Sequence, residues 1–161
     1  MTNESILSDA RDRAEPWTRP PHDEETRNTV RHWLETCESN EDSREALIDA
    51  FYRDLSFGTG GLRGKMGPGT NRINATTIAN ATQGLANHLK KVHGEAPSGS
   101  PWRVAVACDS RHRSQEFAQI TSEVLSANGF EAWLYPELRP TPQLSWTVRE
   151  LGALAGVVVT A

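Results

Sequence analysis

The stretch Trp102-Arg103-Val104-Ala105-Val106-Ala107-Cys108 decides the fold of this chain. It is a short and nearly continuous apolar run, which is typical of a strand that is buried on both faces. An amphipathic helix pattern follows, and we expect Ser114 to cap it and Gly129 to end it. A buried strand followed by a helix of this kind predicts the first half of a βαβ unit.

The same alternation repeats toward the C-terminus. The sequence predicts a strand over residues 130–135 and a further strand over residues 154–159. Between them, Thr141 is expected to cap a helix that has Pro142 in its first turn. Strands that alternate with helices favour a mostly parallel (mixed) sheet covered on both faces, so we predict a three-layer α/β/α sandwich.

Sheets of this class bind ligands beyond the carboxyl ends of their strands. The loops at residues 109–113, 136–141 and 160–161 leave those ends. They supply four candidate supports for a site, which are Asp109, Ser110, Arg111 and Thr160. A structural role fits Asp109 and Ser110 equally well, because both side chains readily cap a following helix.

A glycine-rich loop over residues 57–69 precedes this region and carries two cations. Glycines let successive backbone N–H groups converge on an anion, and a guanidinium adds a planar charged fork. We therefore predict a phosphate site in which Arg63 acts beside a backbone nest. The nest residues are Gly58, Gly60 and Gly61. A mobile surface loop remains the alternative.

Neither common phosphate fingerprint fits this loop. A Walker A motif needs a glycine where Thr59 stands and a Ser or Thr where Met66 stands. The dinucleotide pattern fails because Arg63 occupies the position of its last glycine. Any phosphate site here belongs to another class.

Composition excludes several classes of function. The chain has 161 residues and a formal net charge of −4, which argues against a general nucleic-acid surface. Cys37 and Cys108 provide no disulfide framework, and the histidines show no metal-ligand spacing. No apolar run is long enough to cross a bilayer. We therefore expect a soluble, cytoplasmic protein that binds neither nucleic acid nor membrane and holds no metal within this chain.

The sequence predicts three parts. Residues 1–22 are polar and punctuated by prolines, so we expect a poorly ordered tail. Residues 23–56 form a helical lead-in of two amphipathic helices, capped by Asp23 and Ser43. Residues 57–161 form the α/β/α domain, whose last predicted strand is followed by too little chain to cover it, so we expect it to be truncated at its C-terminal end.

Six motifs carry a family resemblance. They are Phe57-Gly58-Thr59-Gly60-Gly61-Leu62-Arg63-Gly64, its extension through Asn74, Thr82-Gln83-Gly84-Leu85-Ala86, Asp109-Ser110-Arg111, Thr141-Pro142 and Val157-Val158-Val159-Thr160-Ala161. In this order they resemble the α-D-phosphohexomutase family, and the extension is similar to its phosphoglucomutase/phosphopentomutase branch. The resemblance covers about residues 55–161.

The resemblance implies that the chain is the first domain of a four-domain sugar-phosphate mutase of carbohydrate metabolism. Such an isomerase interconverts a sugar 1-phosphate and a sugar 6- or 5-phosphate, through a phosphoserine and a bisphosphate intermediate. In the family, a Ser-His-Asn-Pro segment follows the position of Ala161. The catalytic serine is therefore expected immediately after Ala161, and this fragment alone is expected to be inactive.

By matching position, the resemblance assigns phosphate binding to Thr59 and Arg63. It implies Mg²⁺ for the full-length enzyme, with ligands mostly outside this chain, and a sugar bisphosphate as intermediate and activator. The implied partners are small phosphorylated sugars and the remaining domains of the same polypeptide. Two alternatives stay open: a stand-alone binding module for phosphorylated ligands, and a structural piece that pairs with a partner domain.

Overall fold

The computed structural model describes residues 3–160, and the chain divides between Thr77 and Ile78 into two compact units. The first unit holds α1 (Asn3–Ala14), the 3-10 helix η1 (Glu15–Thr18), α2 (Glu24–Thr36), α3 (Glu41–Phe51), β1 (Phe57–Gly58) and β2 (Gly61–Leu62). Helix α4 (Ala75–His93) runs across the division. The second unit continues with β3 (Arg103–Cys108), α5 (Ser114–Ala127), β4 (Glu131–Leu134), α6 (Thr141–Glu150) and β5 (Ala155–Val159).

The N-terminal segment is helical, so the prediction of a poorly ordered tail over residues 1–22 is wrong for the part described. Ala10, Ala14 and Trp17 recur on one face of α1 and η1, and all three are buried. They join a core with side chains of α2 and α3. The members of that core are Ala10, Ala14, Trp17, Val30, Cys37, Leu47, Ala50 and Phe51. The small alanine side chains let α1 approach α3 closely. A buried helix face made of alanines is not indicated by the spacing of large apolar residues.

Of the N-caps predicted for the next two helices, only that of α2 is confirmed. The Asp23 carboxylate accepts a 2.8 Å hydrogen bond from the Thr26 backbone N–H, as expected for an N-cap of α2. At α3 the cap is Asn40, whose side chain accepts from the Ser43 backbone N–H at 3.2 Å. Ser43 itself lies in the first turn and is buried, so its predicted capping role is wrong.

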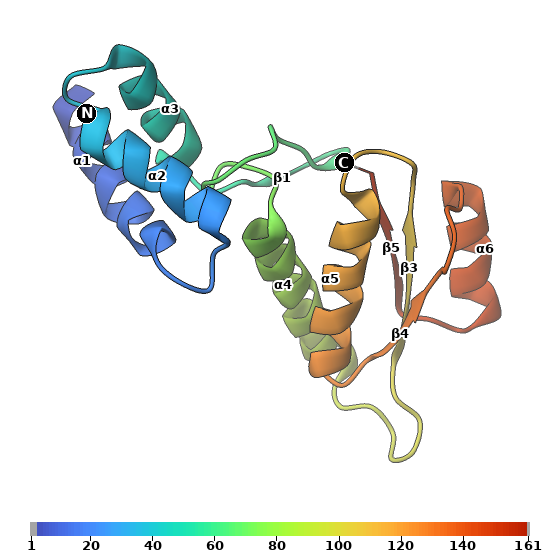
Figure 1. Cartoon of the computed structure of the whole chain (residues 1–161). Coiled ribbons are helices and arrows are strands. Elements are labelled where there is room, and N and C mark those ends of the chain that lie inside the picture. The colour runs from blue at the N-terminus through green and yellow to red at the C-terminus, as the bar shows by residue number, and fades with distance from the viewer. Residues whose placement is uncertain (1–2, 161) are drawn as a thin grey trace. The chain divides into compact units, whose positions relative to one another are not determined.

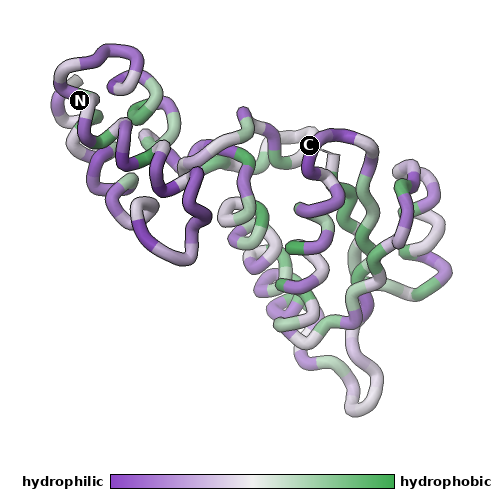
Figure 2. Tube along the Cα trace, viewed as in Figure 1, coloured by the Kyte–Doolittle hydropathy of each residue, from purple (hydrophilic) through white to green (hydrophobic). Residues whose placement is uncertain are grey.

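The second unit is a three-layer α/β/α sandwich, which confirms the predicted fold class. Its sheet has the order β4-β3-β5, and all strands are parallel. Helix α5 covers one face and α6 the other (Figure 1). Figure 2 shows that β3 and β5 are among the most hydrophobic stretches of the trace, as central layers should be.

The faces of the sheet are set by the alternation of β3. Ala105 and Ala107 pack with Leu144 of α6. Gly156 of β5 lies against the same helix, because a Cβ there would stand 2.7 Å from Val148 Cγ2. The small residues of these strands therefore let α6 lie close to the sheet.

Helix α4 packs against α5 rather than on the sheet (Figure 1). The Gln83 and Asn128 side-chain amides exchange two hydrogen bonds of 2.9 and 2.8 Å. Thr82 and Thr121 are both buried at the same contact, with their hydroxyls 3.5 Å apart. This pairing extends the α5 side of the sandwich by a second helix.

Candidate functional site

The start of the glycine-rich loop is a tight hairpin in the first unit. Strands β1 and β2 are antiparallel, with Phe57 opposite Leu62 and Gly58 opposite Gly61. Thr59 and Gly60 form the turn and are exposed. Gly61 adopts a φ of 96°, a conformation that side-chain-bearing residues rarely take. The structure thus brings Thr59 and the three predicted nest glycines together at one exposed tip.

Arg63 follows this hairpin directly and is exposed. Its side chain lies over Gly60, because a Cβ built on Gly60 would be only 2.7 Å from Arg63 Nη2. Among residues 3–160, none forms a hydrogen bond or ion pair with the Arg63 guanidinium. Its five N–H donors therefore face solvent beside the glycine turn, where an anion has access to them.

Lys65 of the loop and Arg72, which follows it, both contact one carboxylate of α3. Arg72 Nη2 donates to Asp49 Oδ2 at 2.7 Å, and Lys65 Nζ donates to the same oxygen at 3.1 Å. The hydrogen bond from Lys65, and then the hydrogen bond and charge of Arg72, lower the pKa of Asp49 below its ordinary value. Arg72, whose side chain is only 11% exposed, is thus committed to protein contacts, in contrast to Arg63, whereas the Lys65 side chain stays 78% exposed beside its ion pair with Asp49.

The candidate supports of the second unit lie at the carboxyl ends of β3 and β5. The Asp109 backbone N–H donates to the Val159 carbonyl at 3.2 Å, which places Thr160 next to Asp109. Ser110 and Arg111 follow in the same exposed loop. The structure therefore brings Asp109, Ser110, Arg111 and Thr160 together at one edge of the sheet.

Asp109 organises the entry into α5. Its Oδ1 accepts from the Arg111 backbone N–H at 3.0 Å and from the Ser114 hydroxyl at 2.9 Å. Its other oxygen lies 3.3 Å from Arg111 Nε. Ser114 was expected to cap α5, but Arg113 occupies the N-cap position in a left-handed conformation, φ 59°. The hydroxyl of Ser114 instead ties the helix start to Asp109.

An open pocket lies beside this edge, between α5 and the end of β4. It has a volume of about 480 Å³ and is lined by Cys108, Gln115, Glu116, Gln119, Leu134, Tyr135 and Pro136. Burial, and then the nearby charge of Asp109, raise the pKa of the Cys108 thiol. No local pattern in the sequence predicts this pocket, because its walls come from three separate elements.

The described residues contain neither a clustered metal-ligand group nor a membrane-spanning helix. Within residues 3–160, no group of three or more His, Cys, Asp or Glu side chains lies close enough together to hold a metal ion. None of the helices described is both long and apolar enough to cross a membrane.

One residue of the site region was missed by sequence reasoning. Asp49 lies 16 positions before Lys65 and 23 before Arg72, so no local spacing connects it to the loop. The only available signal was an acidic residue on the polar side of a helix that is followed by a cation-bearing loop. That pattern is too common to single out Asp49.

Comparison with known proteins places the fold and the loop in a family. Residues 54–161 match the model of the phosphoglucomutase/phosphomannomutase α/β/α domain I. The chain therefore belongs to the phosphoglucomutase/phosphomannomutase family and contains its first domain, which confirms the predicted membership among the phosphohexomutases.

Curated relatives agree with this assignment. A protein of Schizosaccharomyces pombe named probable phosphoribomutase is 33% identical over 145 residues, which cover 90% of this chain and 23% of the relative. A Staphylococcus aureus phosphoglucomutase is 39% identical over 132 residues, 82% of this chain and 22% of the relative. A Staphylococcus haemolyticus phosphoglucomutase is 40% identical over 111 residues, 69% and 19% respectively.

The chain thus spans about a fifth of the length of these relatives. A search of solved structures gave no significant match.

Proposed function

We propose that this chain is the N-terminal domain of a phosphosugar mutase. The whole enzyme would be an intramolecular phosphotransferase that interconverts a sugar 1-phosphate and a sugar 6- or 5-phosphate, through a phosphoserine and a sugar bisphosphate. The family membership and the relatives named phosphoglucomutase and phosphoribomutase support this class of reaction. The domain alone would be inactive, because the proposed serine follows residue 161.

The observation that carries the proposal is the exposed Arg63 guanidinium beside the glycine hairpin. Phosphoryl transfer depends chiefly on positioning and on stabilising charge, so a cationic fork next to the phosphoserine has a direct use. A charge-assisted hydrogen bond to phosphate contributes about 1.5–3 kcal/mol. We assign phosphate binding to Arg63 and Thr59, with the backbone N–H groups of Gly58, Gly60 and Gly61 around them.

We propose the carboxyl edge of the sheet, within the second unit, as a second group of functional residues. Asp109, Ser110, Arg111 and Thr160 lie where the proposed serine loop would leave β5. Asp109 would orient this edge rather than react, since its oxygens are engaged by Arg111 and Ser114. Magnesium would be held mainly by residues beyond this domain, and the proposed location of the enzyme is the cytoplasm.

We also propose a functional division of the chain at about residue 57. The helices before it form a lead-in, and the residues after it form the catalytic first domain. The match to the family model, which begins at residue 54, supports a division near this point.

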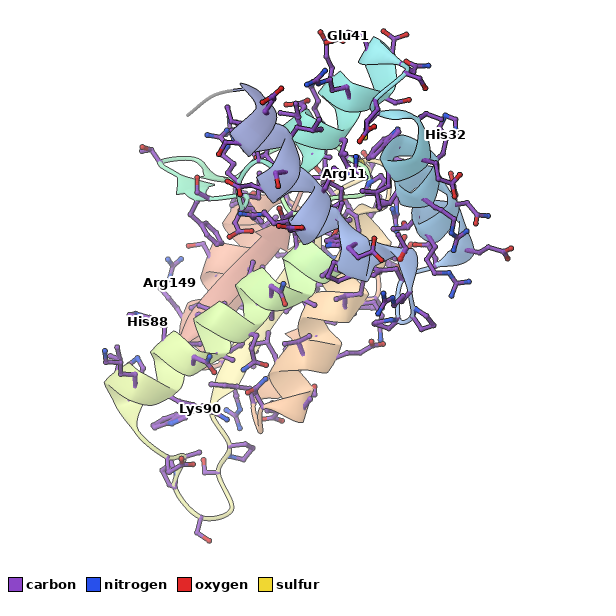
Figure 3. The ribbon with its side chains drawn as sticks, turned by 90° about the vertical axis from the view of Figure 1, so that its left-hand side faces the viewer. Arg11, His32, Glu41, His88, Lys90 and Arg149 are labelled. Atoms are coloured by element: carbon purple, nitrogen blue, oxygen red, sulfur yellow. The ribbon has the colours of Figure 1, made fainter. Side chains whose placement is uncertain are left out.

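The test is a mutase assay on the complete polypeptide that carries this domain. It should convert glucose 1-phosphate to glucose 6-phosphate, or carry out the pentose equivalent, in a magnesium-dependent manner. Arg63→Ala should reduce kcat/KM by about tenfold to a hundredfold, from the loss of one charge-assisted contact. Arg149→Ala, at an exposed arginine of α6 (Figure 3), is the control and should leave the rate unchanged.

The alternative of a stand-alone binding module is favoured by the same exposed Arg63. Titration of the isolated chain with glucose 1,6-bisphosphate separates the two proposals. The mutase domain should bind it weakly, because one part of a divided site supplies few contacts. A submillimolar affinity, together with a stop codon directly after codon 161, would favour the module instead.

A further inference from the structure

We propose that helix α3 braces the glycine-rich loop and that Asp49 is a positioning residue for Arg63. The inference about activity rests on the function proposed above, whereas the inference about the brace does not. Helix α3 ends at residue 51 and therefore precedes the region that matches the family model, which begins at residue 54. The brace thus assigns a role in the site to the helical lead-in.

The first line of support is the concentration of contacts on one helical turn. The carboxylate of Asp49 holds Lys65 and Arg72 through the same oxygen. The backbone carbonyl of Asp49 also accepts from Arg72 Nη1 at 3.0 Å and from Asn71 Nδ2 at 2.9 Å. Arg72 is only 11% exposed, so its charge depends on this partner more than an exposed cation would.

The second line of support is the close approach of the loop backbone to Ala50. The Asn71 backbone N–H donates to the Ala50 carbonyl at 2.9 Å. Gly69 has a φ of 122°, and a Cβ on it would stand 2.5 Å from the same carbonyl oxygen. The loop backbone is therefore seated directly on the end of α3.

Further contacts tie down the chain on both sides of the hairpin and Arg63. The Ile73 backbone N–H donates to the Lys65 carbonyl at 2.8 Å, and Leu55 N–H donates to the Thr70 carbonyl at 2.8 Å. Gly64 lies against Leu55, since a Cβ on Gly64 would be 2.9 Å from Leu55 Cδ1.

Arg63 is consequently held between two fixed parts of the chain. The β1–β2 hairpin precedes it, and the braced segment from Gly64 onward follows it. A backbone that is ordered before the ligand arrives reduces the entropy lost on binding. Asp49 contributes to this order chiefly through the largely buried Arg72, and also through its exposed ion pair with Lys65, two positions after Arg63.

The experiment compares Asp49→Asn with Glu45→Gln in the complete polypeptide. Glu45 is an exposed acid one turn earlier on α3, so both changes remove one negative charge from the same helix. Asp49→Asn should speed amide exchange at Ile73 and Asn71 and lower kcat/KM by about tenfold, since small misplacements of a binding group are costly. Glu45→Gln should change neither, and Asp49→Glu should recover part of the loss.

A double variant separates positioning from stability. If Asp49 acts through Arg63, adding Asp49→Asn to Arg63→Ala should lower activity by less than threefold further, while it still speeds exchange at Ile73. An equal activity loss in both backgrounds would overturn the positioning role. Unchanged exchange at Ile73 and Asn71 in Asp49→Asn would overturn the brace itself.

The exchange measurement also keeps the two proposals apart. If the complete polypeptide shows no mutase activity but Asp49→Asn speeds exchange in the loop, the proposed function fails and the brace stands. If wild-type activity is present but Asp49→Asn behaves as Glu45→Gln does, the proposed function stands and the brace fails.

Discussion

Replacing Gly69 with alanine should destabilise the first unit more than the same change at Gly67. Both glycines lie in the same loop and have positive φ, 122° and 143° respectively. A Cβ on Gly69 would be 2.5 Å from the Ala50 carbonyl oxygen and 2.8 Å from its Cβ, whereas a Cβ on Gly67 meets nothing within 4 Å. The pair therefore separates backbone strain from steric contact.

The magnitudes follow from these two differences. Backbone strain costs about 1–3 kcal/mol at either position. The forced contact with Ala50 should add about 1–3 kcal/mol at Gly69 alone, as overpacking does elsewhere. Both changes also remove a glycine from the unfolded chain, and that contribution largely cancels between them. The expected gap corresponds to a further fall in Tm of about 2–12 °C for Gly69→Ala.

Urea and thermal unfolding of the 161-residue chain, followed by circular dichroism, measure this gap. Amide exchange at Asn71, which donates to the Ala50 carbonyl, reports whether the contact with α3 has opened. Equal destabilisation by the two variants, with unchanged exchange at Asn71, would refute the close seating of the loop on α3.

Three further predictions follow from burial and charge. Because the pKa of Asp49 is lowered in the folded chain, its ionised carboxylate stabilises the fold above the ordinary carboxyl pKa, and this stabilisation is lost as the pH falls through the lowered value. The Tm difference between wild type and Asp49→Asn should therefore shrink on acidification. A Tm difference that stays constant with pH would contradict this prediction. Cys108, whose pKa is raised by burial, should react with a thiol reagent at mildly alkaline pH far more slowly when folded than in urea, and equal rates would show that it is accessible. Phe51→Ala, which empties a fully buried site, should cost about 3–5 kcal/mol in urea unfolding, against less than about 1 kcal/mol for Trp146→Ala at a 55% exposed position.

The sheet could be predicted from the sequence because the patterns that indicate its strands are local. The apolar run of β3 and the glycine and proline residues that separate helix from strand occur within short windows, and they predicted the parallel sandwich. Arg63 became a candidate for the same reason, since it lies within the glycine-rich stretch. Local signals did not suffice for the N-terminal segment, because the burial of Ala10 and Ala14 depends on packing against side chains of α2 and α3, which lie further along the sequence.

The contacts between Asp49 and the loop could not be predicted from local sequence patterns. Asp49 meets Lys65 and Arg72 only because the chain turns back after α3, and a carboxylate on a helix surface has many possible partners. The same holds for Ser114, whose hydroxyl reaches back to Asp109 instead of capping its own helix. In each case a side chain had more than one suitable partner, and tertiary structure chose among them.

NMR can measure directly whether Arg63 or Arg72 binds phosphate. Titration of the 161-residue chain with inorganic phosphate, followed through its arginine Nε signals by NMR, compares Arg63 with Arg72 in one sample. We predict that the Arg63 signal shifts progressively with phosphate, while that of Arg72, which is held by Asp49, stays in place. A shift at Arg72 with none at Arg63 would contradict the assignment of Arg63 as the phosphate-binding cation of this domain.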